Sequence, residues 1–342
     1  DALLRQDLRR LLDGLYDVER LVGRIGFGNA NARDLVALKR TLQRIPQIRS
    51  RLLWARSARL QTLRDELDPC GEVVALIDRA IVEDPPILLR EGGLIKPGYH
   101  EGLDRLRQAA EAGRRWLAEL EQRERVRTGI DSLRIRYNEI FGFFIEVPRS
   151  KAHQVPPDYE RRATITHAER FVTPELKARE TEILATQERI EDLEYELFVE
   201  VRGKVAEHIE RLQGVARHLA ELDVYQALAE AAARYGYTRP AVEESDVIEI
   251  REGRHPMVER FLPPGEAFVP NDTDLSAARR LIILTGPNLS GKSVYIRQVA
   301  LITLMAQMGS FVPARSARIG IADRIFARVG ASDDITAGIS TF

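Results

Sequence analysis

The segment that most constrains how this chain folds is residues 286–293, which reads Gly-Pro-Asn-Leu-Ser-Gly-Lys-Ser and fits the pattern G-x-x-x-x-G-K-[ST]. This pattern has chemical meaning only between a buried strand and a helix. Residues 280–285 are largely apolar and β-branched, which predicts a buried parallel strand, and helical spacing begins at Ser293. The order strand, loop, helix favours a phosphate-binding loop over a plain glycine-rich turn.

A loop of this kind places backbone amides and one ammonium group around the phosphates of a nucleotide. Gly286 and Gly291 permit the backbone angles that turn amides toward phosphate oxygens, and the following helix adds its partial positive charge. We expect Lys292 to reach the β- and γ-phosphates and Ser293 to give its hydroxyl to Mg²⁺. The predicted ligands are ATP or ADP with Mg²⁺, bound by Gly286, Pro287, Asn288, Gly291, Lys292 and Ser293.

Nucleotide hydrolysis requires more than this loop. An acidic residue at the end of a strand must hold the metal and position water. After the loop the acidic residues are Asp323, Asp333 and Asp334, and none of them ends an apolar strand pattern. The chain also begins at Asp1, without an initiator methionine. We therefore expect a piece of a longer protein, which keeps the phosphate loop but does not turn over ATP by itself.

Composition restricts the class of protein. A chain of 342 residues predicts two or three domains. The formal net charge of -1 gives no overall basic surface, so any surface for nucleic acid has to be local. The single cysteine, Cys70, excludes an internal disulfide framework, suits a reducing cytoplasm and is expected in a turn or in the core. No run of membrane-spanning length and no signal peptide is present, so we expect a cytoplasmic protein without a membrane partner.

The pattern of apolar residues divides the chain into four segments. We expect 1–128 to be a helical body, 129–175 a small β unit, 176–235 long returning helices, and 236–342 a phosphate-loop domain. The predicted helices of the first segment lie at about 33–44, 47–65, 71–82 and 101–126, with Asn31 as a cap. The predicted strands of the last segment lie at 247–250, 280–285, 318–321 and 324–329.

The returning helices begin at Pro174 and form one long helix or a helix pair. Their apolar stripe fits a coiled-coil seam, or it packs on the first helical segment. The second arrangement is favoured, because the β unit then sits at the tip of an antiparallel arm.

The β unit combines alternating strands with basic loops. Residues 133–137 and 143–147 have period two around a turn, and 164–166 and 170–172 are further short strands. The loops carry a basic set of four side chains: Arg149, Lys151, Arg161 and Arg162. Such a set is either a patch for nucleic-acid phosphates or an ordinary solvated surface.

Several motifs follow one another as they do in one known family. They are Thr285-Gly286-Pro287-Asn288, Gly309-Ser310-Phe311-Val312-Pro313-Ala314, Asp323-Arg324-Ile325-Phe326, Gly330-Ala331-Ser332-Asp333-Asp334 and Ser340-Thr341-Phe342. Gly253-Arg254-His255-Pro256, Gly142-Phe143-Phe144-Ile145 and Lys96-Pro97-Gly98-Tyr99 extend the likeness over nearly the whole chain. These residues resemble the MutS family of DNA mismatch-repair ATPases.

The resemblance implies an architecture and partners. The family has a helical core or lever, a β clamp at the tip of long helices, and an ABC-like ATPase domain. The clamp contacts the backbone of duplex DNA without reading sequence, which assigns Arg149, Lys151, Arg161 and Arg162 to DNA phosphates. The full-length parent is then a homodimer or a paralogue heterodimer that works with a MutL-type partner, and is nucleoid-associated if bacterial. Its nucleotide state switches it between scanning and sliding forms on DNA.

The resemblance also implies residue roles at the nucleotide. Phe268 stands where an aromatic ring stacks on adenine, with Val269 beside it, although a lone aromatic in a proline-rich loop is usually a core residue. Ser340 stands at the serine that reaches the γ-phosphate of the partner's nucleotide, although it also suits a helix cap. His255 lies near the site or has a structural role.

The expected fold class is therefore multidomain and mainly α, with a small inserted β clamp and a partial α/β P-loop (ABC-like) ATPase domain. The mismatch-reading module of the family has no counterpart ahead of the first helix. Departures at Leu289-Ser290, Val294 and Ile339 leave a recombination-type paralogue open. A non-catalytic DNA-binding arm is a second reading. A chromosome-maintenance ATPase of the ABC type is a third, but it requires a longer heptad run and a glutamine-bearing loop.

Overall fold

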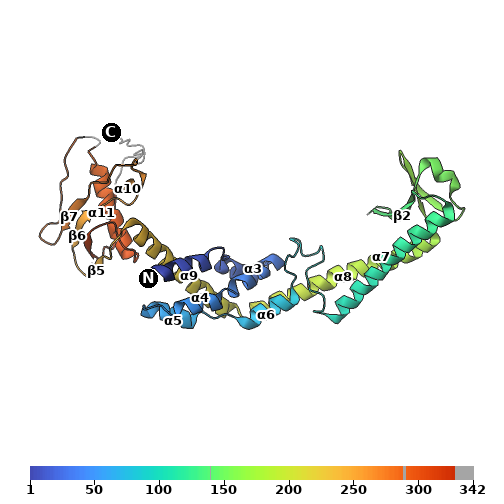
Figure 1. The fold of residues 1–342 in the computed structure, drawn as a ribbon, viewed down its shortest axis with the longest axis horizontal. Coiled ribbons are helices and arrows are strands. Elements are labelled where there is room, and N and C mark those ends of the chain that lie inside the picture. The colour runs from blue at the N-terminus through green and yellow to red at the C-terminus, as the bar shows by residue number, and fades with distance from the viewer. Residues whose placement is uncertain (139, 288–289, 328–342) are drawn as a thin grey trace. The chain divides into compact units, whose positions relative to one another are not determined.

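The computed structural model describes residues 1–138, 140–287 and 290–327 (Figure 1). The chain divides into two compact units. One contains Asp1–Asp13, Arg51–Leu63 and His218–Phe342, and the other contains Gly14–Ser50 and Arg64–Arg217. The described residues are mostly helical with small sheets, which confirms the mainly α, multidomain part of the predicted fold class. None of the described helices is both long and apolar enough to cross a membrane.

Short helices make up most of the first hundred residues. They are α1 (Ala2–Leu12), α2 (Val18–Gly26), α3 (Ala32–Leu42), α4 (Ile45–Leu52), α5 (Ala58–Glu66) and α6 (Gly71–Ala80). Asn31 caps α3 as predicted, because its side chain accepts from the Asp34 amide while the Asp34 carboxylate accepts from the Asn31 amide. The predicted helix 47–65 is wrong. The chain turns between α4 and α5, and this turn lets Leu52 and Leu63 both be fully buried.

Cys70 is a buried structural residue, as expected. It precedes α6 as its N-cap residue with a left-handed backbone (φ 44°), and its amide donates to the Asp68 carboxylate at 2.8 Å. Burial is the largest cause that raises the pKa of the Cys70 thiol to about 11. The thiol is therefore protonated at neutral pH and is a poor nucleophile.

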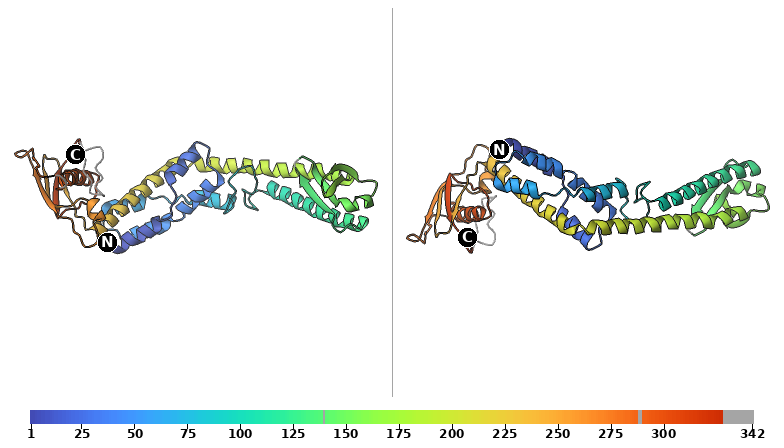
Figure 2. Two further views of the ribbon diagram at one scale, coloured as in Figure 1. Left: turned by 90° about the horizontal axis from the view of Figure 1, so that it is seen from above. Right: turned by 90° about the horizontal axis from the view of Figure 1, so that it is seen from below.

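Two long helices carry the β unit. They are α7 (Glu101–Thr128) and α8 (Pro174–Ala206), and they run side by side within their compact unit (Figure 2). A third long helix, α9 (Ile209–Tyr235), follows α8, so the predicted long segment from Pro174 is the helix pair α8 and α9. The apolar stripe of α8 packs on α2, α6 and α7, which agrees with packing on the first helical segment.

A buried carboxylate on α8 joins this helix to α7 and to the segment before α7. The Glu194 side chain, which is 2% exposed, accepts from the Leu94 amide at 2.7 Å and from the Arg107 guanidinium at 2.6 Å. The same Arg107 nitrogen donates to the carbonyl of Ile95 at 2.6 Å. One carboxylate thus joins α8, α7 and the connection that precedes α7.

The β unit is one antiparallel sheet. Its strands are β1 (Arg134–Asn138), β2 (Gly142–Pro148), β3 (Glu160–Thr164) and β4 (Ala168–Val172) in the order β1-β2-β4-β3, with the short 3-10 helix η1 (Arg149–Gln154) after β2. The predicted hairpin and the strand 170–172 are confirmed. The predicted strand 164–166 is wrong beyond Thr164, because the Ile165 amide donates to the Ala168 carbonyl and closes the turn to β4.

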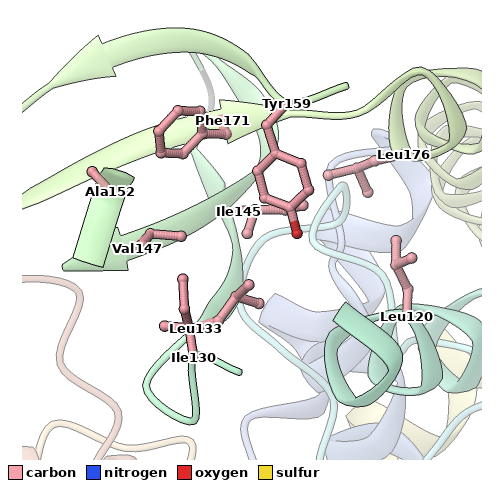
Figure 3. Packing of buried hydrophobic residues seen from close by; sticks show 9 residues of the cluster. All are labelled: Leu120, Ile130, Leu133, Ile145, Val147, Ala152, Tyr159, Phe171 and Leu176. Atoms are coloured by element: carbon pink, nitrogen blue, oxygen red, sulfur yellow. The ribbon is translucent and has the colours of Figure 1, made fainter. Parts of the chain in front are cut away.

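The β unit has its own core at the ends of α7 and α8 (Figure 3). Its buried members are Leu120, Ile130, Leu133, Ile145, Val147, Ala152, Tyr159, Phe171 and Leu176. The Tyr159 hydroxyl donates to the Glu124 carboxylate of α7 at 2.8 Å, and both side chains are buried. Because Ala152 lies in this core, η1 packs against the sheet. The backbone that carries Arg149 and Lys151 is therefore fixed relative to the sheet.

Removing the Tyr159 hydroxyl should destabilise the β unit. We expect Tyr159→Phe to lower the free energy of unfolding by about 1.5–3 kcal/mol, because it removes a buried hydrogen bond to a charged group. Urea unfolding measures the change. Tyr225→Phe is the matched control, since its hydroxyl donates to Glu221 at an exposed site of α9. Equal stability of Tyr159→Phe and the wild-type chain would show that the Glu124 contact contributes nothing.

The second sheet lies in the other compact unit. Its strands are β5 (Ala241–Glu243), β6 (Ile248–Gly253), β7 (Asn271–Leu275) and β8 (Ser316–Gly320) in the order β5-β8-β6-β7, and the helices α10 (Val258–Phe261) and α11 (Lys292–Gln307) belong to the same unit. The predicted strands at 247–250 and 318–321 are confirmed. Helix α11 packs on this sheet through Ile302 and Ala306, which meet Ile250 and Ile319 in one core.

Two predicted strands of this segment are wrong in the structure. Residues 280–287 and 324–327 form no strand, and Leu281, Ile283 and Phe326 are exposed; the end of the second predicted strand, 328–329, lies outside the described residues. A strand persists only where neighbouring strands satisfy its backbone groups. Among the described residues, β5 to β8 pair with one another and none pairs with either segment.

Candidate functional site

The phosphate-loop pattern ends at the start of α11. Gly291 has a left-handed backbone (φ 86°) and is the N-cap residue of this helix, so the chain turns sharply into Lys292. The Lys292 ammonium donates to the carbonyls of Gly286 and Pro287, at 2.6 Å each. The Lys292 side chain thus bonds back to the start of the loop that precedes it. Ser293 lies in the first turn of the helix. Asn288 lies outside the described residues.

This arrangement can bind an anion. The first backbone amides of α11 have no acceptor within the helix, they lie at the positive end of the helix dipole, and the Lys292 ammonium group belongs to the same turn. The two carbonyls that hold Lys292 are neutral acceptors, whereas the oxygens of a phosphate group share its negative charge. A phosphate would therefore be the stronger partner for this ammonium.

The loop before β7 contains Phe268 and Val269, the two residues that the family resemblance assigns to the adenine base. Val269 is 77% exposed and Phe268 is half-buried, so neither belongs to the core that α11 forms with the sheet. The Asn271 side-chain amide donates to the Val269 carbonyl at 3.0 Å and fixes the end of this loop on β7. Ser340, the remaining predicted residue, lies outside the described residues.

His255 has a structural role here. Its Nδ1 accepts from the amides of Met257 and Val258 at 3.3 and 3.2 Å, at the start of α10. The ring is 2% exposed, and this burial, followed by the charge of Arg297, lowers the pKa of His255. A neutral imidazole with Nδ1 as an acceptor is the form that fits these amides.

Sequence reasoning missed Tyr295 on the first turns of α11. Its hydroxyl lies 3.0 Å from the Thr273 hydroxyl and 3.3 Å from the Asp272 carbonyl, both on β7. The spacing in the sequence could have indicated this contact. Tyr295 is three residues after Lys292, and it lies on the same helix face as the buried Gln298 and Ile302. An aromatic ring with a polar tip at such a place usually finds a hydrogen-bond partner.

The four basic residues predicted to contact nucleic acid fall into two pairs. Arg149 and Lys151 project from η1, and neither forms an ion pair with any residue in the described part of the chain. Arg161, by contrast, is 2.9 Å from the buried carboxylate of Glu169, and Arg162 is 3.9 Å from Glu160. The pair on η1 therefore offers positive charge without a carboxylate partner in the described residues, whereas each arginine of the pair on β3 has a carboxylate within 4 Å.

A further basic pair was missed on the sheet itself. Arg136 and Arg170 lie 3.3 and 3.7 Å from the same carboxylate, Glu146, on the strand between them. The Arg170 guanidinium also lies over the ring of Phe144, 4.4 Å from its centroid. Two cations sharing one anion leave excess positive charge on β1, β2 and β4, which the alternation of arginines along β1 could have indicated.

Comparison with known proteins places both regions in one family. Residues 98–189 match the model "MutS family domain IV", and residues 282–342 match "MutS domain V". The chain is 52% identical over 342 residues to a protein of Acetivibrio thermocellus named DNA mismatch repair protein MutS, 51% over 341 residues to its namesake in Symbiobacterium thermophilum, and 50% over 342 residues to that of Halothermothrix orenii. Each match covers 99% of this chain but only 38–39% of the relative. The chain thus spans about two fifths of the length of the curated relatives that it matches.

Proposed function

The chain belongs to the MutS family, and we propose that it serves DNA mismatch repair by contacting the backbone of duplex DNA and by binding nucleotide. The relatives named above are all called mismatch-repair proteins, which favours repair over a recombination-type paralogue. Dimerisation, a MutL-type partner and a nucleotide-driven switch between DNA-bound states are parts of the same proposal.

The observation that carries the proposal is the pair of basic residues on η1. Arg149 and Lys151 have no ion pair within the described residues, they precede the buried Ala152 on η1, and they lie within the residues that match domain IV. Cations on a short helix that packs against the sheet, and that are not held by carboxylates, are suited to DNA phosphates, because no internal ion pair has to be broken first. We assign the main backbone contacts to Arg149 and Lys151, and minor ones to Arg161 and Arg162.

A salt series on DNA binding tests this assignment. Arg149→Ala/Lys151→Ala should weaken binding to a short fluorescent duplex roughly tenfold near 0.1 M salt and reduce the slope of log affinity against log salt by about 1.8. Fluorescence anisotropy measures both quantities. The matched control is Arg64→Ala/Lys204→Ala, which removes the same charge at sites paired with Asp65 and Glu200.

The two basic pairs can also be compared directly. Arg161→Ala/Arg162→Ala should have a smaller effect, because Glu169 and Glu160 already balance these cations. An unchanged salt slope for Arg149→Ala/Lys151→Ala, or equal slopes for the two pairs, would contradict the assignment.

For the nucleotide we propose ATP or ADP with Mg²⁺ at the loop before α11. Lys292 and the amides around Gly291 would hold the phosphates, Ser293 would supply a hydroxyl to Mg²⁺, and Phe268 with Val269 would contact the base. Gly286, Pro287 and Asn288 complete the loop, and Ser340 would serve a partner's nucleotide. The closed loop around Lys292 and the match of residues 282–342 to domain V support this assignment.

A further inference from the structure

Helix α11 and strand β7 lie at the two ends of the proposed nucleotide site. Helix α11 begins with Lys292 and Ser293, and β7 follows directly on the loop that carries Phe268 and Val269. The phosphate end and the base end of a nucleotide would therefore be held by two separate elements. Their relative position decides whether both ends can be bound at once.

A polar contact joins these two elements near the phosphate loop. The Tyr295 hydroxyl meets the Thr273 hydroxyl at 3.0 Å and the Asp272 carbonyl at 3.3 Å, and Thr273 is only 2% exposed. The apolar contacts of α11 with the sheet begin about one turn further along, at Val299 and Ile302. The phenol of Tyr295 thus joins the first turns of α11 to β7 before the apolar contacts with the sheet begin.

We propose that Tyr295 is a positioning residue, which sets the distance between the phosphate-binding and base-binding halves of the nucleotide site. The inference rests on the proposed function, because it assumes that this loop binds ATP. A ligand that touches both halves gains affinity when they are held at the right separation, since the second contact is then intramolecular. Tyr295 would contribute this gain without touching the nucleotide.

Calorimetry with two ligands distinguishes positioning from general support. Tyr295→Phe should weaken binding of Mg-ATP about threefold to tenfold, the loss expected for one hydrogen bond. The affinity for inorganic tripolyphosphate with Mg²⁺ should stay unchanged, because that ligand has no base. Tyr225→Phe, which removes a hydroxyl from α9, should leave both affinities unchanged.

Hydrogen exchange without nucleotide gives an independent readout. In Tyr295→Phe the amides of β7 and of the first turn of α11 should exchange about threefold to tenfold faster, whereas those of β8 should not change. In a double-mutant cycle, Thr273→Val with Tyr295→Phe should lose less ATP affinity than the sum of the single variants, because both remove the same contact.

Three results would overturn the inference, and they are distinguishable. Equal losses for ATP and tripolyphosphate would mean that Tyr295 merely supports the loop. Unchanged ATP affinity together with unchanged exchange would mean that the contact has no positioning effect. A wild-type chain that binds neither ligand would reject the nucleotide site itself, and the positioning role with it.

Discussion

Replacing Lys292 by alanine should weaken the binding of Mg-ATP to this chain by roughly tenfold to a hundredfold. The ammonium is the charged group that ends the phosphate loop, and a hydrogen bond to a charged partner contributes about 1.5–3 kcal/mol. In the structure this group is held by the carbonyls of Gly286 and Pro287, so it already lies over the loop where phosphates are expected. Calorimetric titration with ATP in the presence of Mg²⁺ measures the loss.

Two variants control this experiment. Lys204→Ala removes the same side chain from α8, where it pairs with Glu200, and should bind ATP like the wild-type chain. Lys292→Arg keeps the charge but replaces a compact ammonium by a planar fork, and should recover only part of the affinity. If Lys292→Ala binds ATP as tightly as the wild-type chain, the loop is not the phosphate site.

Replacing Glu194 by alanine should destabilise the unit that contains α7 and α8 by about 2–4 kcal/mol, the cost of leaving two groups without their main acceptor. Among the described residues, the partly buried Arg107 guanidinium keeps only the more distant carboxylate of Asp104 as an ion-pair partner, at 3.6 Å, and the Leu94 amide loses its acceptor. Because a folded domain is stable by only about 5–15 kcal/mol, the loss should move the urea midpoint of this unit far downward.

The same helix provides the control. Glu196→Ala removes an exposed carboxylate two residues away, and should change stability by no more than about 0.5 kcal/mol. Glu194→Gln, which keeps the shape and one acceptor but loses the charge, should lie between the two. Similar urea midpoints for Glu194→Ala and Glu196→Ala would refute the claim that this carboxylate holds the arm together.

The parts of the fold that local sequence determines were predictable. The N-cap at Asn31, the hairpin of β1 and β2 and the start of α8 after Thr173 all depend on residues within a few positions of one another. The point where one helix ends and the next begins was less predictable, because the turn between α4 and α5 depends on which leucines are buried in the core. The helical spacing of apolar residues continues across this turn, so it predicted a single helix over 47–65.

The least predictable features depend on partners distant in the sequence. The apolar run at 280–285 has the composition of a buried strand, yet a strand forms only where another strand pairs with it. The four basic residues of the β unit looked equivalent as a sequence. In the structure Arg161 differs from Arg149 and Lys151, because the pairing of β3 with β4 brings Arg161 close to Glu169. Tyr295 was overlooked for the same reason, since its partner lies on β7.

The buried Cys70 gives the chain a built-in reporter of its own opening. Thiol reagents attack the thiolate, and a fully buried group with a pKa of about 11 offers almost none at neutral pH. Labelling must therefore wait until the start of α6 opens. The labelling rate then measures how often that opening occurs, and a ligand that stabilises the surrounding helices would slow it. Because the sequence has one cysteine, this signal would come from a single place in the molecule.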